Sequence, residues 1–453
     1  MTTMSNRANF GSRIGIVLAT AGSAVGLGNV WRFPTMTGEN GGAAFLLLYV
    51  LCVAAIGIPG MLCEFIIGRR AQANAAQSFK QLAGRTPWRL IGYFGVLTGF
   101  LIASYYSVVS GWCLQYVGAS LTDRLGDSPE AVADYFTAFS TNPWQPVACL
   151  VLFFLCSHFV IVRGVQKGIE RASKLMMPVL FILLLIIAVS ACLLPGARQG
   201  ITFLFSPDFS KVDGSTLLAA LGQAFYSLSL GMGCLVTYAS YFNRDTHLLK
   251  SATQIASIDT VIAVLAGLMI FPAVFSVGGD VGAGPSLVFI TLPNVFNEAF
   301  SAVPFVGHAM ALLFYLLLSV AALTSLMSLH EVCTAFLHED FHLSRTKAAT
   351  IVTAVCCIIG TFCSLSFYNA DLSLFGMSLF DLFDFTTGQI FLPLGGFLTC
   401  LFVGWYVPRH IIVDELTNQG TLQSRFIGLF LFSVRFVCPI AILLVFLNQM
   451  GVI

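Results

Sequence analysis

Apolar stretches of about 20 residues recur along the whole chain, and this pattern limits the folds that the chain can adopt. A helix of that length crosses the roughly 30 Å of hydrocarbon in a bilayer, and inside lipid the backbone must pair its own polar groups. Short charged segments separate the stretches. We therefore predict an all-α, polytopic membrane protein with eleven transmembrane helices, at residues 14–36, 42–68, 90–122, 145–163, 170–194, 216–241, 252–277, 306–337, 347–367, 377–406 and 427–449.

Composition argues against a water-soluble protein. Hydrophobic residues make up 57% of the 453 residues and charged residues only 9%, which is too little polar surface to cover a globule of this size. The lipid bilayer is therefore an expected partner. Because apolar stretches continue along the whole chain, we predict a single transmembrane domain that covers residues 1–453.

The distribution of Lys and Arg predicts the orientation. Of the 22 basic residues, 17 fall in segments on the side of the N-terminus and three in loops on the opposite side, while Arg32 and Arg435 lie in or at the edge of spans. Positive charge is retained on the cytoplasmic side of a membrane. We therefore expect a cytoplasmic N-terminus, and the odd number of spans then puts the C-terminus outside.

Several functional classes find no support in the sequence. A net charge of +1 without a clustered basic face argues against nucleic acid as a partner. The 13 Cys are scattered without a C-x-x-C pair, so neither a zinc site nor a disulfide framework is indicated. No Ser–His pair, H-E-x-x-H motif or Cys cluster lies at membrane depth, which argues against an enzyme. An ion channel would need rings of polar residues along a pore, whereas the polar residues concentrate at two helix breaks.

These breaks are glycine-rich segments, residues 21–34 in the first span and 227–233 in the sixth. Broken helices at corresponding positions of two halves are typical of transporters built from inverted repeats, whose binding site lies near the bilayer midplane. We therefore predict helices 1 and 6 to be unwound at mid-membrane within a 5+5 inverted-repeat core. Its repeats would be residues 1–200 (spans 1–5) and 201–406 (spans 6–10), with residues 407–453 carrying an additional span 11. The alternative is that these glycines only allow close packing of helices.

Several motifs resemble those of one known family. They are Arg13, the run 21–34, Glu39-Asn40-Gly41-Gly42, Gly57-Ile58-Pro59 with Glu64, Tyr105-Tyr106, residues 167–171, residues 237–241 and Leu323-Thr324-Ser325. With them, the chain resembles the neurotransmitter:sodium symporter family, whose members share the leucine-transporter fold. Eleven spans look like a prokaryotic member, which implies a bacterial inner-membrane protein that carries an amino acid together with sodium. The resemblance implies two sodium ions and no organic cofactor.

The resemblance also implies where the ions bind. One sodium would be held by the Ala24 carbonyl, the side chains of Asn29 and Ser227, Asp259 and the carboxylate of the substrate. The second would be held by the carbonyls of Gly22, Val25 and Ala321 and the hydroxyls of Thr324 and Ser325. Spacing supports this second group, because residues 321, 324 and 325 fall on one helical face. The alternative for Thr324 and Ser325 is hydrogen bonding to a backbone carbonyl one turn earlier.

By the same resemblance, the substrate would lie on the amides of Leu27 and Gly28 and against the Tyr106 hydroxyl, bordered by Ala24 and Ser227. Its side chain would face a set of mostly apolar residues, Ile102, Tyr226, Ser229, Met232 and Leu326. This lining offers no countercharge, so we predict a neutral hydrophobic or aromatic amino acid. The alternative is that an aromatic residue or Met at these positions is an ordinary packing residue.

Gates are also implied by the resemblance. Arg32 and Asp384 would close the outer side through a water-assisted ion pair with Tyr226 as a lid, and Arg7 and Glu339 would close the cytoplasmic side near Tyr241. Gly168 and Pro178 form a Gly-x9-Pro pattern at which span five would unwind, although an ordinary proline kink would explain it equally well. His330 and Glu331 have no clear role, and we expect them to be solvated on the cytoplasmic pathway.

Asp259 departs from the family pattern, which usually has Asn at this position. A fixed carboxylate would supply the negative charge that bound chloride supplies in animal members, so we predict chloride-independent transport by alternating access. An intramembrane acid could also carry a proton, which leaves a proton-coupled carrier of the same fold as the alternative. The sequence leaves the choice between a monomer and a homodimer open.

Overall fold

The computed structural model describes residues 8–126, 128–278, 287–299, 304–422 and 426–451, and most of them are helical. The first half of the chain forms α1 (Arg13–Ala24), α2 (Phe33–Glu39), α3 (Ala43–Cys52), α4 (Ile58–Ala71), α5 (Ala75–Ala83), α6 (Leu90–Leu121), α7 (Pro129–Ser140), α8 (Gln145–Val162), α9 (Arg171–Cys192) and α10 (Ala197–Phe205). The second half forms α11 (Gly214–Ser227), α12 (Cys234–Ala239), α13 (Leu248–Ser276), α14 (Leu292–Ala299), α15 (Pro304–Asp340), α16 (Arg345–Leu365), α17 (Leu379–Phe385), α18 (Leu392–Leu401), α19 (Arg409–Leu416), α20 (Ile427–Phe432) and α21 (Cys438–Gln449).

Wider helical turns of the π type join several of these helices into longer rods. They cover Gly28–Arg32, Val53–Gly57, Val165–Glu170, Leu287–Thr291, Thr386–Phe391, Phe402–Tyr406 and Ser433–Val437. Two 3₁₀ turns, at Pro87–Arg89 and Phe209–Lys211, and one short antiparallel pair, β1 (Ser373–Leu374) and β2 (Met377–Ser378), complete the described elements. Regular backbone pairing is thus almost wholly within helices, as a chain in lipid requires.

Nine helices among the described residues are long and apolar enough to cross a bilayer, or ten if the bent pair Arg13–Ala24 and Gly28–Glu39 is one span. They are Ala43–Ala71, Pro87–Leu121, Gln145–Val162, Val165–Cys192, Leu248–Ser276, Phe305–Asp340, Arg345–Leu365, Leu379–Tyr406 and Ile427–Gln449. These rods coincide with ten of the predicted spans. The sixth predicted span, 216–241, corresponds to α11 and α12, which are separated by residues 228–233. The total of eleven spans therefore stays a prediction.

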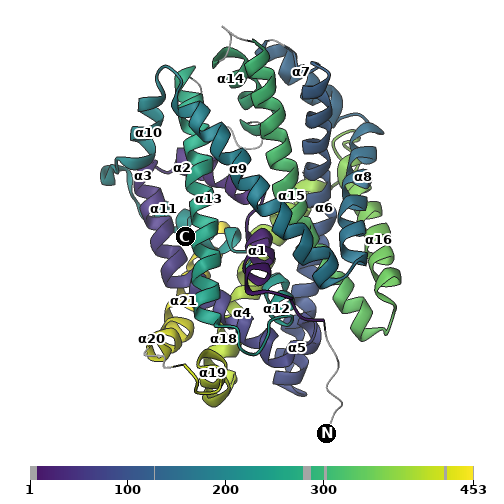
Figure 1. The fold of residues 1–453 in the computed structure, drawn as a ribbon, viewed down its shortest axis with the longest axis vertical. Coiled ribbons are helices and arrows are strands. Elements are labelled where there is room, and N and C mark those ends of the chain that lie inside the picture. Colours follow the sequence, from purple (N-terminus) through teal and green to yellow (C-terminus); the bar gives the residue numbers. More distant parts are fainter. Residues whose placement is uncertain (1–7, 127, 279–286, 300–303, 423–425, 452–453) are drawn as a thin grey trace.

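The long helices run side by side along the longest axis of the molecule, as Figure 1 shows. Helices α7 and α14 lie at one end, which we call the outer end, and α5 and α19 lie at the other, which we call the inner end. Glycines allow close contacts in this bundle: a methyl group on Gly111 of α6 would lie 2.7 Å from the Leu150 amide of α8, and one on Gly360 of α16 would lie 2.7 Å from the Ser104 carbonyl of α6. Small residues at such crossings let helices pack tightly without a polar core.

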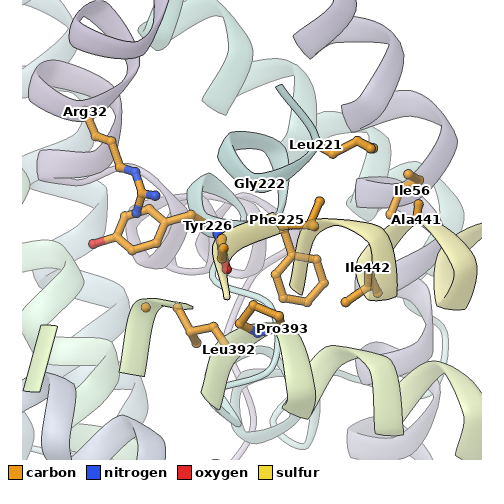
Figure 2. A pocket seen from close by; sticks show the side chains of 13 residues that line it. Arg32, Ile56, Leu221, Gly222, Phe225, Tyr226, Leu392, Pro393, Ala441 and Ile442 are labelled. Atoms are coloured by element: carbon orange, nitrogen blue, oxygen red, sulfur yellow. The ribbon is translucent and has the colours of Figure 1, made fainter. Parts of the chain in front are cut away.

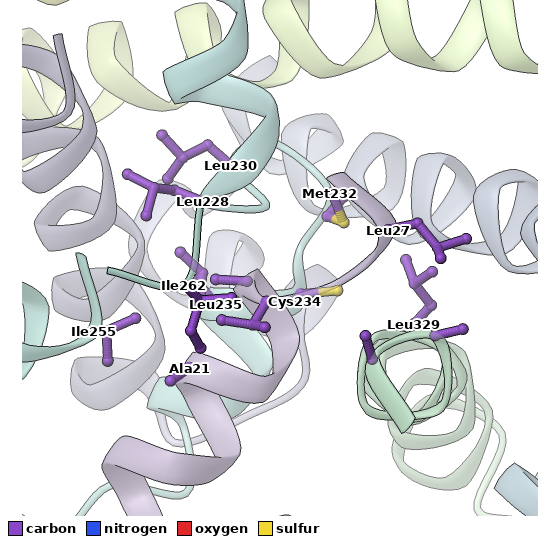
Figure 3. Close-up of a cluster of buried hydrophobic side chains, with 14 of the residues drawn as sticks. Ala21, Leu27, Leu228, Leu230, Met232, Cys234, Leu235, Ile255, Ile262 and Leu329 are labelled. Atoms are coloured by element: carbon purple, nitrogen blue, oxygen red, sulfur yellow. The ribbon is translucent and has the colours of Figure 1, made fainter. Parts of the chain in front are cut away.

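The apolar core surrounds the two breaks in the helices. Figure 3 shows Leu27, which follows α1, lying next to Leu329 of α15, with Met232 nearby on the segment between α11 and α12. Ile255 and Ile262 of α13 belong to the same cluster, and all five side chains are buried or nearly so. The core therefore holds both interrupted segments between continuous helices.

Candidate functional site

The first break interrupts the rod that begins at α1. Helix α1 ends at Ala24, Val25 has extended backbone (φ −74°, ψ 110°), and the next helical turn begins at Gly28 with its axis bent by 56°. Side chains pair the released amides: the Gly26 N–H donates to Asn29 Oδ1 at 3.2 Å, and the Leu27 N–H donates to the Tyr106 hydroxyl at 3.4 Å. The break therefore exposes backbone groups to a site without leaving them unpaired.

The second break lies between α11 and α12. Ser229, Gly231 and Gly233 have positive φ values of 55°, 84° and 75°, which glycine adopts readily and serine rarely. The buried Glu64 carboxylate accepts the Gly231 N–H at 2.7 Å, and the Ser229 hydroxyl donates to the Ser23 carbonyl at 3.0 Å. The second break thus contacts the first one directly. That both breaks lie at mid-membrane stays a prediction.

Buried oxygens around Asp259 form the first of two clusters. The Asn29 amide nitrogen donates to Asp259 Oδ1 at 2.7 Å, and the Ser227 Oγ and the Asp259 carbonyl each lie 3.2 Å from it. The Ser227 hydroxyl donates to Asp259 Oδ2 at 2.8 Å, and Tyr49 donates to the same oxygen at 3.0 Å. All four side chains are buried. We call this set, together with Ala24, the Asp259 cluster.

The structure therefore brings together Asn29, Ser227 and Asp259, three of the residues predicted for the first sodium, and adds one that the sequence analysis missed. Tyr49 comes from α3, and its ring lies in the core with its hydroxyl on Asp259. No spacing within the sequence relates residue 49 to residue 259. A need to pair a buried carboxylate was the only signal available, and it does not name the partner.

A second group of oxygens lies on the other side of the first break. The Val25 carbonyl accepts from the Ser325 hydroxyl at 3.2 Å and from the Thr324 hydroxyl at 3.4 Å. Thr324 also donates to the Ala321 carbonyl at 2.9 Å. A methyl group on Gly22 would lie 3.4 Å from Thr324 Cβ, so Gly22 is in contact with the same residue. We call these five residues the Thr324 cluster, and none of them carries a charge.

A cavity of about 50 Å³ lies between the two breaks. Its walls include Ser23, Ala24, Gly26, Leu27, Gly28, Ile102, Tyr106, Tyr226, Ser227, Ser229, Met232, Ser325, Ser328, Leu329 and Leu392. Nine of the ten residues predicted to contact substrate are among them. Leu326 is not, because it faces another side of α15, and Leu329 lines the cavity instead. Residues 325, 328 and 329 are spaced i, i+3 and i+4, so a helical wheel would have favoured Leu329.

The cavity lining mixes hydroxyl groups with apolar side chains. Seven residues with hydroxyl groups border it, Ser23, Tyr106, Tyr226, Ser227, Ser229, Ser325 and Ser328. The apolar lining residues include Leu27, Ile102, Met232, Leu329 and Leu392. None of the lining residues is ionisable except the tyrosines, and Ser227 of the lining donates a hydrogen bond to the Asp259 carboxylate. Such a site suits a small amphiphilic ligand whose apolar part is uncharged.

Tyr226 separates this cavity from a smaller one toward the outer end. The smaller cavity, of about 20 Å³, is lined by Arg32, Ile56, Phe225, Tyr226, Leu392 and residues of α21. Figure 2 shows the Arg32 side chain lying over the Tyr226 ring, and the guanidinium carbon is 4.2 Å from the ring centroid. Asp384 is exposed and hydrogen bonds to Tyr105. The described residues contain no direct Arg32–Asp384 ion pair within 4.0 Å, so their pairing through water stays a prediction.

At the inner end the expectation for Glu331 is wrong. Glu331 is fully buried, and its carboxylate accepts hydrogen bonds from both terminal nitrogens of Arg345, one of them at 3.1 Å. The Tyr241 hydroxyl donates to the same carboxylate at 2.7 Å, and the Tyr241 carbonyl accepts the Phe10 N–H at 3.0 Å. An acid in a span is paired rather than solvated, and the partner here begins the next helix, α16. This set joins α15, α16 and the segment after α12.

His330 is also fully buried, so its predicted solvation is wrong as well. Its two ring nitrogens lie 3.1 Å from the Ser157 hydroxyl and 3.3 Å from the Ala349 carbonyl, which satisfies a neutral imidazole. Of the predicted inner gate, Arg7 lies outside the described residues. Glu339 accepts from the Asn74 N–H at 2.7 Å and from its side-chain amide at 3.0 Å.

Span five is continuous in this structure. Gly168 lies in the wide turn Val165–Glu170, where a methyl group would collide with the Val160 carbonyl, and α9 continues through Pro178 without interruption. Unwinding between Gly168 and Pro178 therefore stays a prediction about another conformation.

Comparison with known proteins gives a consistent relationship over the whole chain. The model of the family described as the Sodium:neurotransmitter symporter family matches residues 7–129 and 131–453. The chain is 39% identical to the uncharacterized sodium-dependent transporter YhdH of Bacillus subtilis, over 98% of this chain and 97% of that protein. An uncharacterized sodium-dependent transporter of Haemophilus influenzae is 35% identical over 99% of each chain. Among solved structures, that of MhsT in complex with L-phenylalanine has a TM-score of 0.88 and 43% identity, covering 98% of this chain and all of that one.

Proposed function

The chain belongs to the sodium:neurotransmitter symporter family, and on this premise we propose that it moves a neutral hydrophobic or aromatic amino acid together with sodium by alternating access. One observation carries this proposal: the cavity between the two breaks is lined by both hydroxyl groups and apolar side chains, and it adjoins the buried Asp259 cluster. A related structure, 43% identical, holds L-phenylalanine. An aromatic amino acid combines polar groups with an apolar ring, and this lining offers partners for both.

In our proposal the substrate's polar groups face the breaks. Its carboxylate would accept from the Leu27 and Gly28 amides and from the Tyr106 hydroxyl, which already lies 3.4 Å from the Leu27 nitrogen. Its ammonium would donate to carbonyls of the interrupted segments. Its side chain would lie among Ile102, Met232 and Leu329, and since Met is flexible, Met232 would adapt to side chains of different size.

The Asp259 cluster would bind the first sodium ion with the substrate. Three oxygens, from Ser227 and Asp259, converge on the Asn29 amide nitrogen at 2.7 to 3.2 Å. A cation prefers the same all-oxygen surroundings. Sodium binding would therefore turn the Asn29 amide so that its oxygen faces the ion, and the substrate carboxylate would complete the shell beside Ala24.

The Thr324 cluster would bind the second sodium ion through neutral oxygens only. The carbonyls of Val25 and Ala321 already converge on the hydroxyls of Thr324 and Ser325 within 3.4 Å. Those hydroxyl hydrogens would turn away on binding so that lone pairs face the ion, and the Gly22 carbonyl would join them. Two ions with one zwitterionic substrate would make transport respond to the membrane potential, worth about 2.3 kcal/mol per charge per 100 mV.

Alternating access would use the contacts at the two ends. At the outer end Tyr226, under Arg32, would act as the lid, with Arg32 and Asp384 paired through water. At the inner end the Glu331–Arg345–Tyr241 set would add to the gate proposed for Arg7 and Glu339. We further propose eleven spans, ten of them in two inverted repeats of five and one additional, with the inner end facing the cytoplasm of a bacterial cell.

Chloride independence follows from the Asp259 carboxylate, because it supplies the negative charge beside the first ion. Uptake at fixed sodium, measured in chloride and then in gluconate, tests this directly. Equal rates are expected. A requirement for chloride would contradict our interpretation of Asp259.

The proposal as a whole is tested by uptake of radiolabelled neutral amino acids into proteoliposomes. We expect accumulation with an inward sodium gradient and none with potassium in its place, and Asn29→Ala should abolish it. Accumulation that ignores sodium and follows a pH gradient would establish the proton-coupled alternative. Our reason to favour sodium is that the family and two of the relatives are described by their sodium dependence.

A further inference from the structure

Arg435 is a basic residue within a membrane-spanning rod that the transport proposal does not use. It lies in the wide turn Ser433–Val437 of the rod Ile427–Gln449 and is half-buried. Its Nε donates to the Gly404 carbonyl at 2.6 Å, and its guanidinium carbon is 5.5 Å from the centroid of the Trp405 ring. A basic side chain that starts within a span either pairs with another group or reaches toward the membrane interface.

The contact with Gly404 uses only one of the three guanidinium nitrogens of Arg435, the Nε. The Gly404 carbonyl would ordinarily accept from the N–H four residues later, but that residue is Pro408, which has none. Arg435 Nε satisfies this carbonyl at the C-terminal end of a helix, where a positive charge is favourable. A methyl group on Gly404 would lie 3.1 Å from Arg435 Cγ, so glycine lets the arginine stem lie flat on the helix.

The contact with Gly404 does not use the two terminal nitrogens of Arg435, which carry four N–H groups. Among the residues that the structure describes, no carboxylate lies within 4.0 Å of this guanidinium. Around it the surface is aromatic and uncovered by protein: Trp405, Phe432 and Phe436 are 59%, 57% and 45% exposed. Trp405 contacts the Phe436 ring edge-on at 5.6 Å, and Phe432 packs on Phe436 at 5.7 Å.

The depth of this surface follows from the end of the neighbouring rod. Gly404 lies two residues before Tyr406, the last residue of the rod Leu379–Tyr406, and α19 at the inner end begins at Arg409. Two residues correspond to about 3 Å along a helix. The guanidinium therefore lies within one turn of the end of the span, where interfacial Trp residues and lipid phosphates are found.

We propose that Arg435 and Trp405 form a binding site for the headgroup phosphate of a membrane phospholipid in the leaflet at the inner end. The two free nitrogens form a fork that matches two phosphate oxygens, and the exposed rings of Trp405, Phe432 and Phe436 provide an apolar face for the glycerol and the first part of an acyl chain. An uncompensated positive charge selects an anion, and the surrounding lipid-facing aromatic residues select one that carries acyl chains.

Native mass spectrometry of the delipidated full chain in detergent tests this site by counting bound lipid during titration with phosphatidylglycerol or phosphatidylethanolamine. We expect Arg435→Gln to weaken phospholipid binding about tenfold, because it removes charge-assisted hydrogen bonds. Trp405→Leu should weaken it about threefold. Arg409→Gln is the matched control, since Arg409 is an exposed arginine at the same end, and it should change nothing. Diacylglycerol, which lacks the phosphate, should bind equally weakly to wild type and to Arg435→Gln.

Unchanged phospholipid affinity in Arg435→Gln would overturn the proposal, and so would an equal loss in Arg409→Gln. Displacement of the phospholipid by millimolar inorganic phosphate would identify a site for soluble anions instead. Thermal unfolding followed by circular dichroism reports whether Arg435→Gln folds. If it does not, Trp405→Leu decides alone, and unchanged affinity in that variant overturns the proposal.

Discussion

The Asp259 cluster and the Thr324 cluster lie on either side of the same helix break but differ in charge. The first holds a buried carboxylate that receives three hydrogen bonds and shares Ser227 with the cavity. The second contains only carbonyls and hydroxyls around Val25. Each cluster shares a hydroxyl with the cavity, Ser227 in the first and Ser325 in the second, so the carboxylate is what distinguishes them. The difference therefore predicts separate roles for the two ions.

Removing the charge from the first cluster should have the largest effect. In chloride-free medium, Asp259→Asn should lower sodium-driven uptake about 10- to 100-fold, because hydrogen bonds to a charged group are worth about 1.5–3 kcal/mol. Chloride should restore part of the loss, and uptake in chloride and gluconate measures both effects. Asp134→Asn, an exposed acid of α7, is the control. Full activity of Asp259→Asn in gluconate would remove the distinction between the clusters.

Gly26 lies between the two clusters, so a methyl group there should damage both. Its Cβ would collide with the Ser325 hydroxyl and lie 3.2 Å from that of Tyr106. We expect Gly26→Ala to lower the affinities for sodium and substrate about tenfold, since overpacking costs about 1–3 kcal/mol. Equilibrium binding of radiolabelled substrate at varied sodium checks this. Gly118→Ala, in open space on α6, should be neutral, and a neutral Gly26→Ala would show that this region is not tightly packed around the ligands.

A neutral ligand of the second cluster should matter less than the charged one. Thr324→Ala removes one hydroxyl, worth about 1 kcal/mol or about fivefold in sodium affinity, and should leave transport independent of chloride. Thr334→Ala is the same substitution ten residues further along α15, at a buried hydroxyl outside the cluster. Sodium titration of uptake separates the two variants. Equal effects would mean that Thr324 has only a packing role.

The smallest effect concerns access to the second cluster from the inner end. Glu331 lies seven residues beyond Thr324 on α15, about 10 Å toward that end. Glu331→Gln should weaken the contact with Arg345 and raise maleimide labelling of the buried Cys234 about threefold by favouring an open inner end. Residue-resolved mass spectrometry measures the labelling of Cys234. Glu130→Gln, which changes an exposed acid of α7, is the control. Unchanged labelling would exclude a gating role for this ion pair.

The membrane-spanning rods could be predicted from the sequence because each depends on a local property, the length of an apolar stretch. The predicted boundaries of 42–68, 90–122 and 145–163 differ by a few residues from Ala43–Ala71, Pro87–Leu121 and Gln145–Val162. Most residues around the cavity were also predicted, but through resemblance to a family rather than from spacing. The glycine-rich runs supplied the independent local signal.

What the sequence did not predict depends on contacts between distant segments. The rotation of α15 about its axis decides that Leu329 rather than Leu326 borders the cavity, and neighbouring helices set that rotation. The hydroxyl of Tyr49 reaches Asp259 from another span, and Arg345 reaches back to Glu331 across the turn between α15 and α16. An acid within a span predicts that a partner is present, but only the packing of the helices identifies the partner residue.

The central claim is that the substrate carboxylate completes the first sodium shell beside Asp259. Its most direct test is equilibrium binding of phenylalanine and of its decarboxylated amine to the purified protein, each in sodium and in potassium. We predict that sodium tightens phenylalanine binding about tenfold or more, a common size for coupled sites, while binding of the amine is the same in both cations. Equal sodium dependence of the two ligands, or none for phenylalanine, would contradict the account.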